Sequence, residues 1–348
     1  MARAAFKSIC FLSIFFLVSK VNAEAVTLNL LNWDEYISTT VLEKFKTETG
    51  ISINVIHYAS DASRDEVLTS PAAKSFDLVV IDNYSTRLFS RSKLLLDLSQ
   101  HEIPNRVHLD SRWQHSCGAH GLPYFWGTLG IAYRADKLKS TPASWSDLLQ
   151  PKAEYHGHIG MLLDAIDTLA PALKLAGHSM NSVSETELKS AFDLLTQQQP
   201  HVLTYQHGVS FLKSDAGSEL YMALVFGGDQ YAMNADEEGP WQYIIPREGT
   251  ALWVDCLAVL SSSIHQKDAI SFLDFLNRPE VAALNAEEVG SASANRAAIN
   301  LLPDDIKNDH VLYPDETTLR ASEEYQTLPA GSLRIREKII EVLGSNED

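Results

Sequence analysis

The stretch FDLVVI at residues 76–81 decides the fold class of this chain. It is almost continuously apolar, which is the pattern of a parallel strand buried on both faces of a sheet. Upstream, ISINVIHY at 51–58 alternates apolar and polar residues, and VTLNLL at 26–31 is also strand-like. Between these two runs, Thr40 and Glu43 have the spacing of a capping box that opens a helix. This order of strands and helices predicts an α/β protein whose parallel sheet carries helices on both faces.

Helix and strand patterns continue to alternate along the rest of the chain. Ser184 and Glu187 have capping-box spacing at the start of another helical pattern. A strand-like run follows at 253–260, and residues 269–284 carry a further helical pattern of apolar residues. The chain is longer than a single hydrophobic core usually allows, so we expect two lobes. Because the sequence contains no repeat, low-complexity tract or Gly/Ser-rich linker, we expect crossing strands to join them.

The lobe boundaries are expected at these crossing strands. Lobe 1 is predicted to contain residues 24–130 and 256–302, and lobe 2 residues 131–255 and 303–348. Ligands of open α/β sheets bind beyond the carboxyl ends of the strands. The residues that directly follow the strands therefore bear most on function.

The N-terminus has the pattern of a secretory signal peptide. Arg3 and Lys7 precede an apolar run at 9–18, and the segment that ends at Ala23 has small or apolar residues at the two positions that a signal peptidase reads. The run is shorter than the roughly 20 residues of a membrane-spanning helix, which argues against a retained anchor. We predict that residues 1–23 are a signal peptide cleaved after Ala23.

The composition excludes several classes of protein. The chain has 348 residues, with 28 Lys and Arg against 45 Asp and Glu, a net charge of −17 and 45% hydrophobic residues. This composition is that of a globular protein and not of a disordered or fibrous one. So acidic a chain is a poor nucleic-acid binder, because phosphates need basic residues to neutralise them. Cationic partners are favoured instead.

Two cysteines remain once the signal peptide is removed. Cys117 and Cys256 would then be in a compartment where disulfides persist. A bridge between them would close a loop of more than 100 residues, for which the chain-entropy model gives roughly 4–5 kcal/mol. The sequence leaves open whether they form this bridge or remain two separate buried thiols.

Acidic and aromatic residues occur together at the ends of three predicted strands. The segments are Asn32-Trp33-Asp34-Glu35-Tyr36, Asp82-Asn83-Tyr84 and Trp253-Val254-Asp255. Carboxylates accept the ammonium groups of an organic cation, and aromatic faces cover its methylene groups and attract its charge by roughly 0.5–2 kcal/mol per contact. Alternatively, the aromatic residues belong to the core and the acids cap helices. Three such segments together favour a site for an organic cation.

These segments, together with others, resemble the spermidine/putrescine-binding proteins of polyamine transport systems, a branch of the two-lobed periplasmic solute-binding proteins. The similarity extends along the chain, and the order and spacing of the motifs are more specific than any single one. The motifs are Asn32-Trp33-x-Glu35-Tyr36, KFKTETG at 44–50, Asp77-Leu78-Val79-Val80, LPYFWG at 122–127, Trp253-x-Asp255, Asn295-x-Ala297-Ala298 and Leu312-Tyr313-Pro314-Asp315. The resemblance implies the type II periplasmic solute-binding fold and a periplasmic location.

The resemblance also implies a ligand site in the cleft between the lobes, with aromatic side chains around the ligand and acids at its amine groups. The residues that it assigns to this site are Trp33, Glu35, Tyr36, Tyr84, Asp164, Asp167, Phe226, Trp253, Asp255 and Gln326. Asp164 and Asp167 are expected at the start of a helix, where a spacing of three places both carboxylates on one face. Simple capping of that helix is the alternative.

The sequence departs from the family pattern at four of the site positions. Asp34 and Asp82 add acids where the family commonly has small hydroxyl residues. The second acid of the pair, Asp167, is an aspartate, which is shorter than a glutamate by one methylene group. Phe226 stands where a Trp is expected. A carboxylate that is one methylene shorter moves by about 1.5 Å, which suits a different spacing of amines. The resemblance therefore implies the polyamine class and does not imply which polyamine is preferred.

Two roles follow from the resemblance. In the first role, which we favour, the protein would present a polyamine of the spermidine, norspermidine or putrescine class to the permease of an ABC transporter. In the second role, it would report ligand occupancy to a membrane-bound sensor protein. A cysteine-dependent enzyme on the same fold is a more distant alternative, because His115 and His120 flank Cys117.

We expect no enzymatic activity, no cofactor, no metal site and no nucleic-acid partner. The segments HSCGAH at 115–120 and His156-Gly157-His158 lack the spacing of a four-ligand metal site. The sequence also lacks the glycine motifs that bind nucleotide phosphates and the motif of a nucleophilic serine. We expect a monomer.

Overall fold

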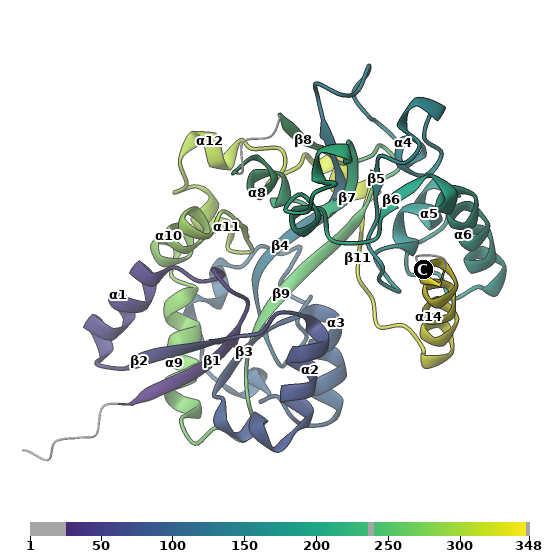
Figure 1. Cartoon of the computed structure of the whole chain (residues 1–348). Coiled ribbons are helices and arrows are strands. Elements are labelled where there is room, and N and C mark those ends of the chain that lie inside the picture. Colours follow the sequence, from purple (N-terminus) through teal and green to yellow (C-terminus); the bar gives the residue numbers. More distant parts are fainter. Residues whose placement is uncertain (1–25, 236–239, 346–348) are drawn as a thin grey trace, which may run out of the picture.

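The structure is a computed structural model that describes residues 26–235 and 240–345 (Figure 1). Two α/β lobes lie side by side, and long strands run between them. The expected type II solute-binding fold, with two lobes joined by crossing strands, is therefore confirmed. The predicted signal peptide and its cleavage site after Ala23 lie outside the described residues.

The first part of the chain forms alternating strands and helices, as the sequence predicts. These elements are β1 (Thr27–Asn32), α1 (Thr39–Thr49), β2 (Ser52–His57), α2 (Asp61–Thr69), β3 (Leu78–Asp82) and α3 (Asn83–Arg91). β1 pairs in parallel with both β2 and β3. In β3 the residues from Leu78 to Ile81 are fully buried, which confirms the interpretation of FDLVVI as a strand covered on both faces.

The sheet is mixed: the parallel pairing that the sequence predicts is present among β1, β2 and β3, whereas the crossing strands pair antiparallel. The long strands β4 (Leu122–Arg134) and β9 (Ala251–Val259) lie next to each other, and β9 pairs antiparallel with both β3 and β4. A strand that returns from the other lobe enters the sheet in the opposite direction, and hydrophobicity alone carries no information about strand direction. The strand order is β2-β1-β3-β9-β4-β7-β5-β6.

Strand β4 passes from one lobe into the other (Figure 1). Its first half pairs with β9, from Leu122 to Thr128. Its second half pairs with β7 (Met222–Phe226) and with β8 (Trp241–Ile244). Since one strand serves both halves of the sheet, the lobes are tied together by main-chain hydrogen bonds.

The second lobe and the return of the chain contain the remaining elements. The further strands are β5 (Ile159–Gly160), β6 (Val202–Thr204), β10 (Ala292–Ser293) and β11 (Glu323–Glu324). The further α-helices are α4 (Trp145–Leu149), α5 (Leu169–Leu175), α6 (Glu185–Gln198), α7 (Gly208–Phe211), α8 (Asp229–Ala235), α9 (Gln266–Leu276), α10 (Pro279–Val289), α11 (Arg296–Ile299), α12 (Asp304–Lys307), α13 (Glu316–Ala321) and α14 (Ala330–Gly344).

Three predicted helix signals differ from the structure in detail. The cap of α1 is Ser38, whose hydroxyl accepts from the Val41 amide, and not Thr40. Ser184 does precede α6, but its side chain makes no capping bond. The helical pattern at 269–284 is divided between α9 and α10, because Pro279 has no amide hydrogen and begins a new helix.

Buried apolar side chains form two large clusters, which divide within the crossing strands. In β4, Trp126 belongs to the first cluster and Leu129 to the second. Leu312 and Leu319 pack in the first cluster, although the predicted boundaries assign them to lobe 2. The helix α14 adds Ile339 to the second cluster. The lobe boundaries as a whole remain a prediction.

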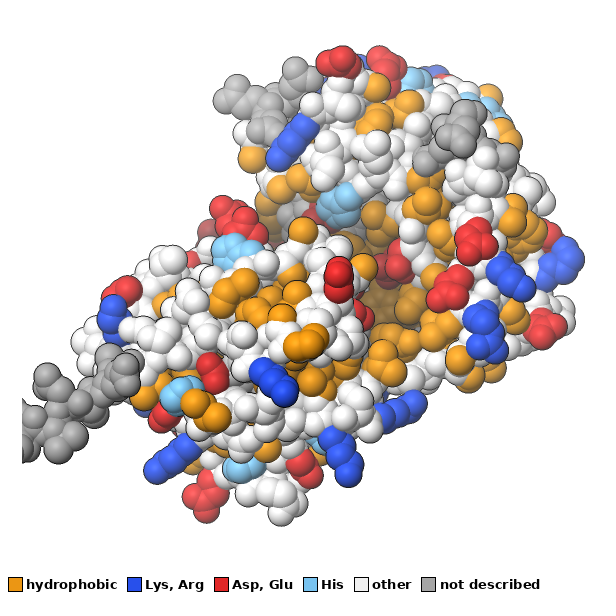
Figure 2. Space-filling view, turned by 60° about the horizontal axis from the view of Figure 1, so that its bottom comes forward, with side chains coloured by type: hydrophobic (Ala, Val, Ile, Leu, Met, Phe, Trp, Pro, Cys, Tyr) orange, Lys and Arg blue, Asp and Glu red, His pale blue; other side chains and the backbone are white. Residues whose placement is uncertain are grey.

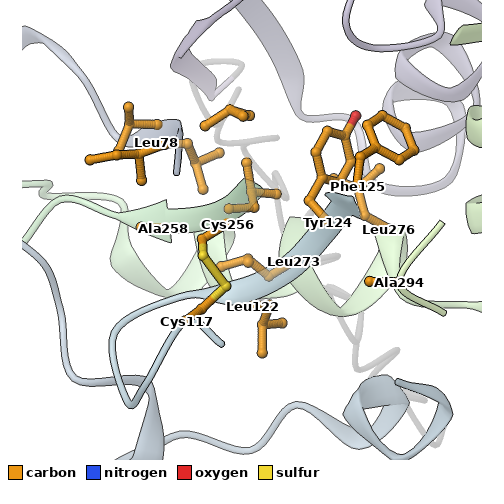
Figure 3. Close-up of a cluster of buried hydrophobic side chains, with 14 of the residues drawn as sticks. Leu78, Cys117, Leu122, Tyr124, Phe125, Cys256, Ala258, Leu273, Leu276 and Ala294 are labelled. Carbon is orange, nitrogen blue, oxygen red and sulfur yellow. A yellow bond between two sulfur atoms is a disulfide. The ribbon is translucent and has the colours of Figure 1, made fainter. Parts of the chain in front are cut away.

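Cys117 and Cys256 form a disulfide, which decides between the two alternatives that the sequence left open. The bridge joins β9 to the loop before β4 and lies among buried apolar side chains of β3, β4 and α9 (Figure 3). Both cysteines are buried. Within the described part of the chain, no helix combines the length and the apolar character needed to cross a membrane.

Candidate ligand-binding cleft

A hollow separates the two lobes, and acidic and hydrophobic side chains lie inside it (Figure 2). β1, β2 and β3 are parallel neighbours, so the residues that follow them come together at one edge of the sheet. The predicted segments after β1 and β3 therefore lie on the lobe 1 side of one site.

Aromatic side chains of lobe 1 form one wall of this site. The Trp33 ring lies 4.3 Å from that of Tyr58, measured between centroids, and Tyr36 meets Phe125 edge-on at 5.2 Å. Between the two, Glu35 adopts a φ of 51°, in the left-handed region that non-glycine residues rarely occupy. Packing of the flanking rings holds this turn in place, so the wall is preformed.

Asp255 lies in β9 beside this wall. The Tyr36 hydroxyl donates to its Oδ2 at 2.8 Å. Burial raises the pKa of the Asp255 carboxyl to about 7, and the nearby charges of Asp82 and Asp61 contribute to the rise. A carboxylate that is costly to ionise without a partner is suited to receive a cation.

Trp253 lies two residues earlier on the same strand, and its position depends on a glycine. A Cβ added at Gly127 of the neighbouring strand would lie 2.3 Å from the Trp253 ring, so the indole lies directly against the bare backbone. Among the described residues, nothing accepts a hydrogen bond from its buried Nε1. The side chain therefore has a donor free for a ligand or for water.

Asp82 has its partners within lobe 1. It caps α3 by accepting from the Ser85 amide at 2.7 Å, and its other oxygen accepts from the Arg64 guanidinium at 3.0 Å. The capping role that the sequence offered as an alternative is thus present in the structure. Whether Asp82 also contacts a ligand remains a prediction.

Asp164 and Asp167 supply the acids of lobe 2. They lie in the turn that leads into α5, which begins at Leu169, so their expected place at the start of a helix is confirmed. Asp164 accepts from the Ile166 and Asp167 amides, which is the capping role offered as the alternative. Burial raises the pKa of Asp167 to about 8, and the Asp164 charge adds to this, while a hydrogen bond from the Tyr325 hydroxyl opposes it.

The segment that contains Tyr325 connects the lobes a third time. β11 adds to the sheet by pairing in parallel with β9. Glu324 accepts from the Asn83 amide at 2.7 Å and from the Ser116 hydroxyl at 2.8 Å. The C-terminal segment thereby links lobe 1 to the Tyr325–Asp167 pair.

The acids of the two lobes are close enough to influence one another. Burial raises the pKa of Asp61 to about 6; Arg64 opposes this rise, whereas Asp82 and Asp164 add to it. Asp61 and Asp82 in turn raise the pKa of Asp167. The hollow is therefore a single electrostatic environment, in which the ionisation of one acid makes the ionisation of the others more costly.

Four other predicted site residues have the following positions. Asp34 is exposed and lies 2.9 Å from the His57 ring nitrogen. Tyr84 lies on α3 and is only partly buried. Phe226 ends β7 near the His207 ring, and Gln326 is exposed, with its backbone amide bonded to Asn181. In the described part of the chain, no group of three or more His, Cys, Asp or Glu side chains is placed to hold a metal ion.

The fold agrees with comparisons to known proteins. The model of the family described as bacterial extracellular solute-binding protein matches residues 40–312. This chain belongs to that family. A norspermidine sensor of Vibrio cholerae serotype O1 is 37% identical to this solute-binding protein over 320 residues, which cover 91% of this chain and 89% of the sensor.

Two further relatives agree with this assignment. The spermidine/putrescine-binding periplasmic protein of Escherichia coli K12 is 28% identical over 312 residues, which are 88% of each chain. The crystal structure of the spermidine/putrescine ABC transporter substrate-binding protein of Streptococcus pneumoniae superposes with a TM-score of 0.82 at 24% identity, over 92% of this chain and 99% of the other. The resemblance to polyamine-binding proteins is thus confirmed at the level of the family, and the last match supports the fold.

The sequence analysis did not select three residues that this structure places beside the predicted site residues. Tyr58 and Asp61 follow β2, so the rule applied to the other strand ends would have found them. Tyr325 was passed over for its neighbour Gln326. No pattern in the sequence shows that the tyrosine faces Asp167, because that contact depends on how the C-terminal segment crosses between the lobes.

Proposed function

We propose that this protein binds a polyamine in the cleft between its lobes. One observation carries the proposal: acids of both lobes have raised pKa values in the same hollow, namely Asp61, Asp167 and Asp255. Burial makes each of them costly to ionise in the empty protein, although Asp61 is already paired with a cation, Arg64. A ligand that brings two or more ammonium groups on one flexible chain would satisfy several of them at once.

The aromatic wall supports an extended aliphatic chain between those ammonium groups. Trp33, Tyr36 and Trp253 offer flat faces to methylene groups and attract an adjacent cation. Glu35, Tyr84, Asp164 and Phe226 are the further contacts that we propose from the family resemblance. A ligand held by acids of both lobes favours the closed arrangement over the open one, because only the closed form makes both sets of contacts.

The proposed setting is the periplasm, where a disulfide persists; the Escherichia coli relative is named as a periplasmic protein. We propose a binding role without catalysis. The cysteine-dependent enzyme alternative needs a free thiolate at Cys117, and that residue is buried and bonded to Cys256.

Delivery to the permease of an ABC transporter remains the role that we propose first. Reporting to a membrane-bound sensor protein is the second candidate, and it is favoured by the higher identity to the Vibrio cholerae norspermidine sensor than to the Escherichia coli periplasmic protein. The two roles differ in a measurable property. A transport component is required for uptake of polyamine by the cell, whereas a sensor component is not.

A thermal-shift titration tests the binding proposal. The protein without residues 1–23 is heated with putrescine, cadaverine, spermidine, norspermidine or spermine at moderate salt. Ligand at about 100 times its Kd should stabilise the folded state by about 2.7 kcal/mol, seen as a higher Tm for one or two of these amines. Equal shifts for all amines that salt abolishes would show attraction to the acidic surface only, and would contradict the proposal.

Binding should strengthen as the pH rises from 6 to 8. At pH 6 most of Asp167 and Asp255 is protonated, since their pKa values are raised to about 8 and about 7. An ammonium ligand needs the ionised carboxylates, so it must displace those protons, and affinity should rise by about tenfold per pH unit for each proton released. Calorimetric titration in two buffers of different ionisation enthalpy counts the protons. Affinity that stays flat or falls over this range would contradict the assignment of these acids.

A further inference from the structure

Arg64 of α2 is a buried cation at the lobe 1 edge of the cleft. Its side chain is 1% exposed, and its nitrogens lie 2.5 Å from Asp61, 2.8 Å from Asp65 and 3.0 Å from Asp82. A fourth bond goes to the Ser85 hydroxyl at 2.9 Å. With these partners around it, the guanidinium is fixed in one orientation, because an Arg presents its donors in a rigid fork.

The guanidinium lies directly behind the proposed ligand contacts. It stands 5.8 Å from the centre of the Tyr58 ring, which in turn packs against Trp33. Asp82, which Arg64 holds, is the residue of β3 that pairs with Asp255 of β9. The positive charge therefore adjoins the carboxylate that we propose as the ammonium acceptor.

Asp82 and Asp255 differ in the partners that their carboxylate oxygens already have. Both oxygens of Asp82 are occupied, one by the Ser85 amide and the other by Arg64. The partner that the structure gives Asp255 is the neutral Tyr36 hydroxyl. An ammonium group that reaches this edge of the cleft would thus find at Asp255 a carboxylate that does not share the Arg64 guanidinium with Asp61, Asp65 and Asp82.

We propose that Arg64 is a positioning residue that acts as a built-in countercharge and limits the number of ammonium groups that lobe 1 receives. This inference rests on the proposed function and concerns its specificity. The guanidinium offsets part of the charge of Asp61, Asp65 and Asp82, so an ammonium group is less favoured beside them than at Asp255, whose partner is the Tyr36 hydroxyl. The cleft then discriminates between polyamines by their number of charges as well as by their length.

The test measures the ratio of the Kd values of spermine and norspermidine, which differ by one amine, by calorimetry at fixed pH and salt. In Arg64→Gln one positive charge is lost, so the ratio should shift by about tenfold or more in favour of spermine. Arg64→Lys keeps the charge and should keep the ratio near that of the unchanged protein. Arg278→Gln, which removes an exposed arginine bonded to Glu48, is the matched control.

Asp82→Asn should shift the ratio of the two Kd values in the opposite direction from Arg64→Gln. It also provides a test if Arg64→Gln does not fold. Asn is a good helix cap, so α3 is retained, while Arg64 then offsets the charge of two carboxylates, Asp61 and Asp65, and no longer of three. The ratio should then shift against spermine. Equal losses of affinity for both amines in Asp82→Asn or in Arg64→Gln would overturn the inference, because a structural residue or a direct ligand contact lowers both. If the unchanged protein binds none of the five amines of the thermal-shift titration, the proposed function fails and the inference fails with it.

Discussion

Replacing Asp255 by Asn should lower the affinity for the preferred polyamine by about 30-fold or more, which corresponds to roughly 2–5 kcal/mol. The carboxylate is the expected counterion of one ammonium, and the amide that replaces it keeps the shape but loses the charge. Tyr36, which donates to Asp255, still finds an acceptor in the amide oxygen. The change in affinity is measured by calorimetric titration above pH 8, where the carboxylate of the unchanged protein is ionised.

The stability of the ligand-free variant separates this effect from unfolding. Burial raises the pKa of Asp255 to about 7, so its folded state holds a proton that the unfolded state releases near pH 4. That proton stabilises the folded protein at low pH, and the stabilisation is lost as the pH rises towards 7. Asp255→Asn should therefore be at least as stable as the unchanged protein at pH 8. Asp193→Asn, at an exposed acid paired with Lys189 on α6, is the control and should keep full affinity. Undiminished affinity in Asp255→Asn would contradict the proposed site.

Removal of the Cys117–Cys256 disulfide should lower the free energy of unfolding by about 5 kcal/mol. The two cysteines are 139 residues apart, and the chain-entropy model assigns about this value to a loop of that length. Cys117→Ala with Cys256→Ala is compared with the oxidised protein by urea unfolding. The midpoint should fall clearly, because the whole stability of a domain is usually only about 5–15 kcal/mol.

A reductant supplies the control for this comparison. It should lower the unfolding midpoint of the unchanged protein and leave that of the double variant where it is. A loss of less than about 1 kcal/mol in the double variant would show that the unfolded chain gains little freedom when the bridge is absent.

The local part of the fold could be predicted from the sequence because it rests on short-range patterns. FDLVVI was recognised as a buried strand because its run of apolar residues is unbroken, and β3 is buried accordingly. The direction of β9 could not be recognised, since a strand has the same hydrophobicity in either direction. The division between α9 and α10 could have been found, because Pro279 stands in the middle of the predicted helix.

The residues of the candidate site that directly follow strands could be predicted from the sequence. The pairing of their charges with side chains far away in the sequence could not. The segments after β1 and β3 were found by their acids and aromatic rings. The pairing of Asp82 with Arg64 joins residues 18 positions apart, and the contact of Tyr325 with Asp167 joins residues 158 positions apart. Neither sequence separation follows from the periodicity of a helix or a strand. Acids that look equivalent in the sequence therefore have different amounts of charge left for a ligand.

The two apolar clusters are each completed by late parts of the chain. The first needs residues of β9, α9 and α10, and the second needs α14, the last helix that the structure describes. Synthesis proceeds from the N-terminus, so neither cluster can close until most of the polypeptide has been made. Such an order of contacts delays collapse while the chain is still growing. In the periplasmic setting that we propose, a nascent chain that has not yet collapsed is suited to crossing a membrane before it folds.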